Sequence, residues 1–374
     1  MTMEEATPKP PRPGSPEFLA MIEHHKDVIE RETGERPEFI LDIGIGDMPG
    51  YLAPMERTEF DTQRLMTDHP PVLYDRNKRA VFDIACPAGC THRGELAYTR
   101  WAAMELPTFV SPAEAVPRVD VREDIYDYAI GADGAVEWHV NFADPSLFVA
   151  YGSGLFAQDE MQVAEHPALG ALREGLRARK WPAKTAEKGR STPVLVKGVE
   201  RRCRVAIDRN VAEGRANGLY GGAFSSSPVD VVRRATVPIE PPTITNLIAI
   251  AAPYGAAGRY TARQIEQILT TAYTGFYAAV CESDGAPVVV HTGFWGCGAF
   301  GGNRVLMSML QLIAAELAGV QRLVFHTVSS AGRAPLDEAM RRIRRDLPAL
   351  QMETRALVKQ VAAMGFEWGE SNGT

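Results

Sequence analysis

The sequence has 374 residues, of which 45% are hydrophobic and 23% charged, and this composition disfavours a largely disordered, collagen-like or coiled-coil chain. At about 150 residues per domain, the length predicts two or three domain-sized pieces, or one large α/β domain with additions. The 40 basic and 47 acidic residues give a net charge of −7. This balance offers no broad basic surface to duplex nucleic acid or to an anionic membrane.

The sequence lacks the pattern of a membrane span or a signal peptide, and this and its cysteine usage lead us to expect a cytoplasmic protein. The most apolar stretch, Val305 to Val320, contains Ser308, Gln311 and Glu316 and is too short to span a bilayer, so we expect a soluble helix there. The N-terminus has acidic residues and prolines where a signal peptide needs a basic start and an apolar run. The five cysteines are odd in number and scattered, which predicts reduced thiols.

The first 120 residues are predicted to form a region outside the α/β core. Residues 1–16 contain five prolines and mixed charges, and we expect a flexible tail. Residues 17–31 have helical spacing of apolar side chains. Many prolines and short apolar pieces follow, so we interpret residues 17–120 as a mainly helical accessory region packed on the core.

Residues 121–374 are predicted to be one α/β domain. Over 121–144, two alternating arms flank the turn GADG, which predicts a β-hairpin. Further along, apolar strands alternate with helices, which indicates a parallel or mixed sheet covered on both faces. In chain order the expected elements are strand 246–252, helix 261–280, strand 287–292, a glycine-rich loop over 293–302, helix 303–320, strand 322–328 and a helical tail over 336–364.

The glycine-rich loop GFWGCGAFGG is the first candidate binding segment. It lies between an apolar strand and a helix, where backbone N–H groups and the helix dipole favour anions. It lacks the lysine of a P-loop and the spacing of a dinucleotide fingerprint. The loop is therefore interpreted either as a phosphate or diphosphate site or as a simple tight turn. Trp295 and Phe300 are expected either to pack in the core or to stack on a ribose or base.

The second candidate segment runs from Asn141 to Leu169. It combines a strand end, a glycine-containing loop and two adjacent acids, Asp159 and Glu160, at the start of a helix. Taken alone, acids at a helix start are usually solvated residues that match the helix dipole. Beside a polar cavity, the same carboxylates are suited to acid–base chemistry.

Together the two segments resemble the catalytic macrodomain of poly(ADP-ribose) glycohydrolases. TGFWGCGAFGGN at 292–303 is close to the family's TGNWGCGAFGGD, and TAYTGF at 271–276 is similar to its KAYCGF. VNFAD, AYGSG, QDE and His166-Pro167 stand where the family has VDFAN, a triple-glycine loop, QEE and Asn-Pro. The resemblance covers about 140–328. It implies a three-layer macrodomain with a mixed central sheet and hydrolysis of an O- or N-ribosyl linkage of ADP-ribose.

The resemblance also implies roles for individual residues. Glu160 falls on the family's catalytic acid, which protonates the leaving oxygen as an oxocarbenium-like state forms and then helps to activate water. Asp159 falls on the preceding glutamate and is expected to raise the pKa of Glu160 or to hold a ribose hydroxyl. The implied ligand-binding residues, with Tyr220 as the adenine-stacking aromatic and Phe300 packing against the ligand, are Asn141, Asp144, Gly152, Gly154, Gln158, Tyr220, Gly296, Cys297, Gly298, Ala299 and Phe300.

The loop after Asp144 departs from the family pattern. Gly152, Ser153 and Gly154 replace only part of the triple glycine, and the loop is shortened. We expect Tyr151 to fill part of the distal-ribose side or to contact whatever is attached there, which favours terminal or single ADP-ribose groups over long polymer. The predicted partner is ADP-ribose or an ADP-ribosylated protein or small molecule, with no cofactor. Two alternatives remain: a noncatalytic ADP-ribose reader, and a hydrolase of another nucleotide-derived glycoside.

Other motifs receive simpler readings. LDIGIGD, at 41–47, resembles the first motif of methyltransferases, but Pro49 stands where a helix should begin. Cys86, Cys90 and His92 have metal-like spacing, yet a tetrahedral zinc site needs more ligands, so a structural loop is favoured and no metal is predicted. Cys297 is interpreted as a small packed residue rather than a nucleophile.

Overall fold

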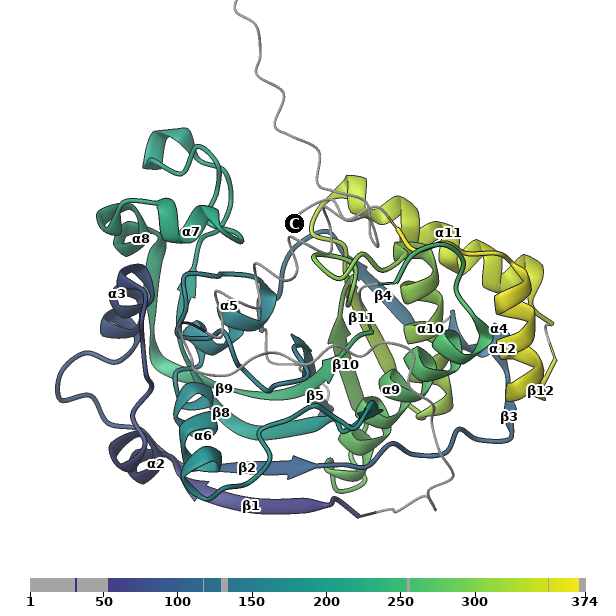
Figure 1. Ribbon diagram of the computed structural model, residues 1–374, viewed down its shortest axis with the longest axis horizontal. Coiled ribbons are helices and arrows are strands. Elements are labelled where there is room, and N and C mark those ends of the chain that lie inside the picture. Colours follow the sequence, from purple (N-terminus) through teal and green to yellow (C-terminus); the bar gives the residue numbers. More distant parts are fainter. Residues whose placement is uncertain are drawn as a thin grey trace, which may run out of the picture.

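A computed structural model describes Arg31 and residues 53–369, except 117, 129–133, 254, 255 and 349. The predicted tail, the helix at 17–31 apart from Arg31, and the LDIGIGD segment lie outside the described residues. At the centre of the described part is a mixed eight-stranded sheet (Figure 1). Its strands are ordered β1 (Glu56–Asp61), β2 (Glu95–Arg100), β8 (Val194–Val205), β9 (Thr236–Ala251), β5 (Val136–Ala143), β10 (Val288–Thr292), β11 (Arg322–His326) and β4 (Val119–Arg122).

The sheet has an antiparallel part and a parallel part. Strands β1, β2, β8 and β9 pair antiparallel, whereas β9, β5, β10, β11 and β4 are parallel to one another. Two short antiparallel pairs lie outside this sheet: β12 (Met352–Glu353) with β3 (Phe109–Val110), and β6 (Ala186–Glu187) with β7 (Arg190–Ser191). In open α/β sheets ligands bind beyond the carboxyl ends of parallel strands, so the parallel part predicts where a site lies.

Helices cover both faces of the sheet and give three layers (Figure 1). One group is α4 (Pro112–Ala115), α9 (Ala262–Cys281), α10 (Arg304–Leu317), α11 (Ser330–Asp346) and α12 (Thr354–Ala363). The other is α2 (Thr62–Asp68), α3 (Arg76–Ala85), α5 (Gln158–Glu165), α6 (Ala168–Ala178), α7 (Ala223–Ser226) and α8 (Val229–Ala235), with a 3₁₀ turn at Val211–Glu213. Side chains alternate between two cores along β9: Ile248 and Ile250 face one, and Leu247 and Ala249 the other.

The predicted α/β class with a mixed central sheet is confirmed, and α9, β10, α10 and β11 occur where the apolar runs predicted them, whereas β9 begins ten residues before the predicted strand. The hairpin prediction for 121–144 is wrong. β4 pairs with β11, and β5 pairs in parallel with β9 and β10. The polar residues of β5 misled the prediction, because His139 and Asn141 alternate with apolar residues yet are themselves buried.

The described part of the N-terminal region is joined to the same sheet. It contributes α2, α3 and α4 but also β1, β2 and β4, so it is less purely helical than expected. The division of the chain into domains stays a prediction. All five cysteines are free thiols. None of the helices in the described residues has the length and apolarity needed to cross a bilayer.

Candidate active site

A cavity of about 1330 Å³ lies at the carboxyl ends of the parallel strands. Its lining includes Asp144, Gly293 and Thr327, which directly follow β5, β10 and β11. Small-molecule sites occupy about 300–1,000 Å³, so this cavity has room for a large ligand. The topology therefore brings both candidate segments, far apart in sequence, to one place.

The start of α5 is clamped to the end of β5. The side-chain oxygen of Gln158 accepts the Phe142 N–H at 2.7 Å, and its side-chain nitrogen donates to the Val140 carbonyl at 3.1 Å. One carboxylate oxygen of Glu160 accepts the N–H of Ala157 at 2.9 Å, which caps the first turn. These bonds hold the two acids of α5 at the carboxyl edge of the sheet.

Asp159 and Glu160 both line the cavity although they are only 6% and 4% exposed. The side-chain amide of Asn141, on β5, donates to Asp159 at 3.0 Å and to Gln162 at 2.8 Å. Burial, and then the negative charge of Glu160, raise the pKa of Asp159 well above its usual range. This environment therefore favours the protonated form of Asp159.

The glycine-rich loop 293–302 forms another part of the cavity wall through its backbone. Gly296 has φ +73°, and a Cβ there would lie 2.6 Å from the Cβ of Ala252. A Cβ on Gly302 would meet the Gly296 carbonyl oxygen, also at 2.6 Å. Trp295 is buried and its indole N–H donates to Ile250, so it packs in the core, whereas Phe300 is half-buried at the cavity wall.

Hydrogen-bond donors on this loop come from the main chain rather than from the following helix. Asn303 caps α10 by accepting the N–H groups of Val305 and Leu306, each at 3.1 Å, so these donors of the helix N-terminus are already used. Within the part of the chain that the structure describes, the N–H groups of Gly298 and Ala299 donate to no protein acceptor. Such main-chain donors in a glycine-rich concavity suit an anion.

The shortened loop after β5 uses its glycines for packing. A Cβ on Gly152 would clash with the Val72 carbonyl oxygen, and one on Gly154 would lie 2.8 Å from the Ser225 side chain. The Gly152 carbonyl accepts the N–H groups of Tyr74 and Asp75. Neither glycine lines the cavity, whereas their neighbours Val149, Ala150 and Leu155 do.

The expectation for Tyr151 is wrong. Its hydroxyl accepts the Val72 N–H at 2.6 Å and donates to Glu174 at 2.9 Å, and its ring is buried outside the cavity lining. Lys78, a fully buried residue of α3, donates to the carbonyls of Tyr151 at 2.9 Å and Leu155 at 2.7 Å. The N-terminal region thus supports the loop from behind.

Most of the predicted site residues meet in the cavity, and three do not. The cavity lining includes Asp144, Gln158, Asp159, Glu160, Tyr220, Gly296, Cys297, Gly298, Ala299 and Phe300, whereas Asn141, Gly152 and Gly154 lie behind it. Burial and the Glu160 charge raise the pKa of Tyr220 to about 12. Burial raises the pKa of the Cys297 thiol, which disfavours a nucleophilic thiolate.

Several segments of the cavity lining were not predicted from the sequence. They include Arg204 at the end of β8, Arg209 after it, Arg304 at the start of α10, residues 124–128, and Ser329, Ala331 and Gly332 at the start of α11. Arginine matches phosphate oxygens in geometry and charge. The arginines sit in sequences without a recognisable motif, so only their position at the cavity identifies them.

The comparisons with known proteins agree with the motif resemblance. Residues 220–334 match the family model described as Poly (ADP-ribose) glycohydrolase (PARG), Macro domain fold. The predicted resemblance to this family is confirmed over those residues. They run from Tyr220 through the glycine-rich loop to the start of α11.

Several solved structures are similar to the chain at low identity. A poly(ADP-ribose) glycohydrolase from Thermomonospora curvata has 15% identity, 87% coverage of this chain, 98% of its own and a TM-score of 0.39. The same organism's enzyme bound to the inhibitor ADP-HPD has 19% identity, with 63% of this chain and 83% of that chain covered and a TM-score of 0.40. The Deinococcus radiodurans enzyme in complex with ADP-ribose has 14% identity, with 63% of this chain and 91% of that chain covered and a TM-score of 0.39.

Proposed function

We propose that this protein hydrolyses the glycosidic linkage of ADP-ribose groups, with Glu160 as the acid–base residue. The observation that carries the proposal is the meeting of Asp159 and Glu160 with the glycine-rich loop in one cavity. The loop offers main-chain donors and the lining offers arginines to a diphosphate, while α5 offers carboxyl groups to a sugar linkage. The family model that matches residues 220–334 supports the same substrate class.

The chemistry follows from how Glu160 is held. One of its oxygens accepts the Ala157 N–H, and the other has no partner among the described residues and is available to a ligand in the cavity. In its protonated form Glu160 donates to the glycosidic oxygen as the ribose C1–O bond breaks. The carboxylate then takes a proton from the water that adds to C1, which restores the acid.

Asp159 is assigned a positioning role beside this acid. Its carboxyl group accepts from Asn141 on β5, so its orientation is set by the sheet. Its raised pKa makes the protonated form available to donate to a ribose hydroxyl. Asp144 and Tyr220 line the same cavity and complete the polar surface around the sugar and base.

A terminal or single ADP-ribose group is the proposed substrate, rather than the interior of a long polymer. An interior unit extends at both ends and needs two openings, whereas a terminal group needs one. Residues 72–75 and Ser225 pack closely against the loop around Gly152 and Gly154. This packing closes the protein behind the part of the cavity wall that the loop forms. This closure is the structural support for the preference.

The decisive experiment measures release of free ADP-ribose by chromatography. The substrates are a mono-ADP-ribosylated protein and long poly(ADP-ribose), and the enzyme is tested beside Glu160→Gln. Glu266→Gln, on α9 of the opposite layer, is the matched control. We expect the mono-linked substrate to be cleaved faster, the control to be fully active and Glu160→Gln to be nearly inactive. Faster cleavage of polymer than of the mono-linked substrate would remove the stated preference.

A binding measurement separates the enzyme from a reader. Ligand at about 100 times its dissociation constant adds roughly 2.7 kcal/mol to the free energy of unfolding, so ADP-ribose should raise the melting temperature more than AMP does. A shift without turnover of any substrate would identify a noncatalytic reader. Absence of a shift at millimolar ADP-ribose, together with absence of turnover, would contradict the proposed function.

A further inference from the structure

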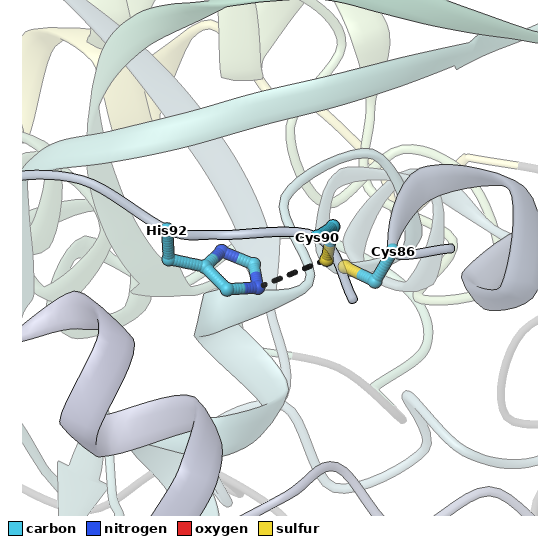
Figure 2. A group of neighbouring side chains, drawn as sticks. All are labelled: Cys86, Cys90 and His92. Carbon is cyan, nitrogen blue, oxygen red and sulfur yellow. Dashed lines mark hydrogen bonds between the residues drawn. The ribbon is translucent and has the colours of Figure 1, made fainter. Parts of the chain in front are cut away.

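Three metal-binding side chains meet outside the cavity, at the far end of α3. Cys86 follows the last residue of α3, Cys90 lies in a turn closed by its N–H to Pro87, and His92 precedes β2. Their donor atoms all lie within 4.8 Å of one another. Figure 2 shows the two sulfurs and the imidazole gathered at one point.

The spacing of these atoms suits one tetrahedral ion. The distance from Cys90 Sγ to His92 Nε2 is 3.9 Å. A thiolate at about 2.3 Å and an imidazole nitrogen at about 2.0 Å from one tetrahedral zinc are roughly 3.6 Å apart. Only a small closure of the loop is therefore needed for both atoms to bind the same ion.

The imidazole of His92 is oriented by a carboxylate. Its Nδ1 lies 3.0 Å from a carboxylate oxygen of Glu200 on β8, and this bond leaves Nε2 facing the sulfur of Cys90. The backbone is fixed as well, because the His92 N–H donates to Gln63 at 2.8 Å and the Arg93 N–H donates to Glu200 at 3.1 Å. A metal-bound histidine almost always has such a carboxylate or carbonyl partner on its other nitrogen.

The charges of the cluster balance around a divalent cation. Two thiolates neutralise the two charges of the ion, and Glu200 pairs with Arg202 at 2.6 Å. Arg202 also donates to the carbonyls of Ala85 at 2.9 Å and Thr91 at 3.2 Å, and so ties both ends of the cysteine-containing loop to β8. The half-buried site is thus built by residues from α3, β8 and the loop between α3 and β2.

We propose that Cys86, Cys90 and His92 bind a zinc ion, with water in the fourth position. Two thiolates and an imidazole are the donors that favour Zn²⁺ over oxygen-preferring cations such as Mg²⁺ or Ca²⁺. From the sequence alone a structural loop was favoured, because three ligands are fewer than a tetrahedral zinc site needs. The convergence of the three donor atoms and the hydrogen bond between His92 and Glu200 favour a metal site instead. None of the three residues lines the large cavity, so the ion lies apart from the candidate active site.

The zinc fixes the end of α3 to the antiparallel part of the sheet. The same helix carries Lys78, whose ammonium group holds the carbonyls of Tyr151 and Leu155 behind the cavity. Anchoring one end of α3 therefore stabilises the helix that supports the cavity wall. The inference does not depend on the proposed hydrolase activity.

The first test measures zinc in the full-length protein kept in a thiol-free reductant. Elemental analysis and Zn²⁺ titration against a chromophoric chelator should both give about one zinc per chain. Co²⁺ in place of zinc should give the charge-transfer absorption of thiolate ligands. Wild-type protein that takes up no stoichiometric zinc, alone or in competition, would overturn the proposal without the need for any variant.

Variants then assign the ligands. Cys90→Ser should lose the zinc and the cobalt charge-transfer band, while Cys281→Ser, at an exposed cysteine, should keep both. Glu200→Gln retains all three ligands and should weaken zinc binding by about 10- to 100-fold, the usual effect of losing an outer-shell partner. Zinc bound equally well by wild type and Cys90→Ser would show that the metal lies elsewhere and would contradict the site.

Discussion

Two walls of the cavity are built in opposite ways. On the α5 wall, side chains make the contacts: the half-buried Gln158 bonds to the main chain of β5, and the buried Asn141 donates to the buried Asp159. On the glycine-loop wall, the main chain itself faces the cavity, and Gly296 and Gly302 are required because a Cβ would collide with neighbouring atoms. The α5 wall therefore depends on side-chain hydrogen bonds, and the glycine-loop wall depends on the close approach of backbone atoms.

The two walls should therefore control different measurements. Carboxyl groups change protonation state, so substitutions on the α5 wall should act on turnover and on pH dependence. A glycine substitution alters the backbone geometry but removes no charge and no ionisable proton. Substitutions on the glycine-loop wall should therefore act on stability and ligand affinity. Three predictions separate the two walls, in descending order of expected effect.

The largest effect is expected for Glu160→Gln. The substitution keeps the shape of the side chain and removes its acidic proton, so kcat should fall by about 100- to 10,000-fold, the usual range for general acid–base catalysis. ADP-ribose affinity, measured by calorimetry, should change little. A parallel loss of affinity would mean that Glu160 binds the ligand rather than acting in the chemical step.

The second effect is expected for Gly296→Ala on the opposite wall. A side chain in the left-handed region costs about 1–3 kcal/mol of unfolding free energy, and the contact with Ala252 adds to this cost. Gly319→Ala is the matched control, because Gly319 has φ +70° but no atom within 4 Å of the added Cβ. Thermal unfolding should show a larger loss for Gly296→Ala, together with weaker ADP-ribose binding. Equal losses in the two variants would contradict the close packing of the loop.

The third effect is a pH-dependent gain in stability for Asp159→Asn. Because the folded-state pKa of Asp159 is raised, the native protein binds this proton more tightly than the unfolded chain does. The free energy of unfolding therefore falls as pH rises from the usual aspartate range to the raised folded pKa, by about 1.4 kcal/mol per pH unit. Asparagine lacks this titration, so the variant should be more stable than wild type at pH values above the folded pKa and equal to it in acid.

Melting temperatures measured across pH test this prediction. Asp284→Asn, at an exposed turn, is the control variant measured alongside. A constant difference between wild type and Asp159→Asn at every pH would show that Asp159 does not carry the raised pKa.

The sequence predicted the centre of the fold better than its edges. Strands β10 and β11 and helices α9 and α10 are long or strongly apolar, and such runs have one stable location, inside a covered sheet. In β1 only Phe60 is buried, so the strand has no apolar run to reveal it. Its place in the sheet is decided by pairing with β2, which is a contact between distant parts of the chain.

The candidate site was predictable where chemistry and motif coincide. Residue type and position singled out Asp159, Glu160 and the glycine-rich loop as candidates, the family resemblance implied their roles, and the fold brings them together. The orientation of a side chain was not predictable. Tyr151 and Gly152 belong to the expected segment, yet the packing of Val72 and Tyr74 turns them to the far side of the loop.

By itself the sequence determined the α/β class, the acids of α5 and the glycine-rich loop, because apolar periodicity and local backbone requirements are written in neighbouring residues. Tertiary structure alone decided the parallel place of β5, the support of the cavity by Lys78 and the convergence of Cys86, Cys90 and His92 with Glu200. The reason is physical: each of these features depends on the direction in which a side chain or strand faces once distant segments pack together, and no local pattern encodes that direction.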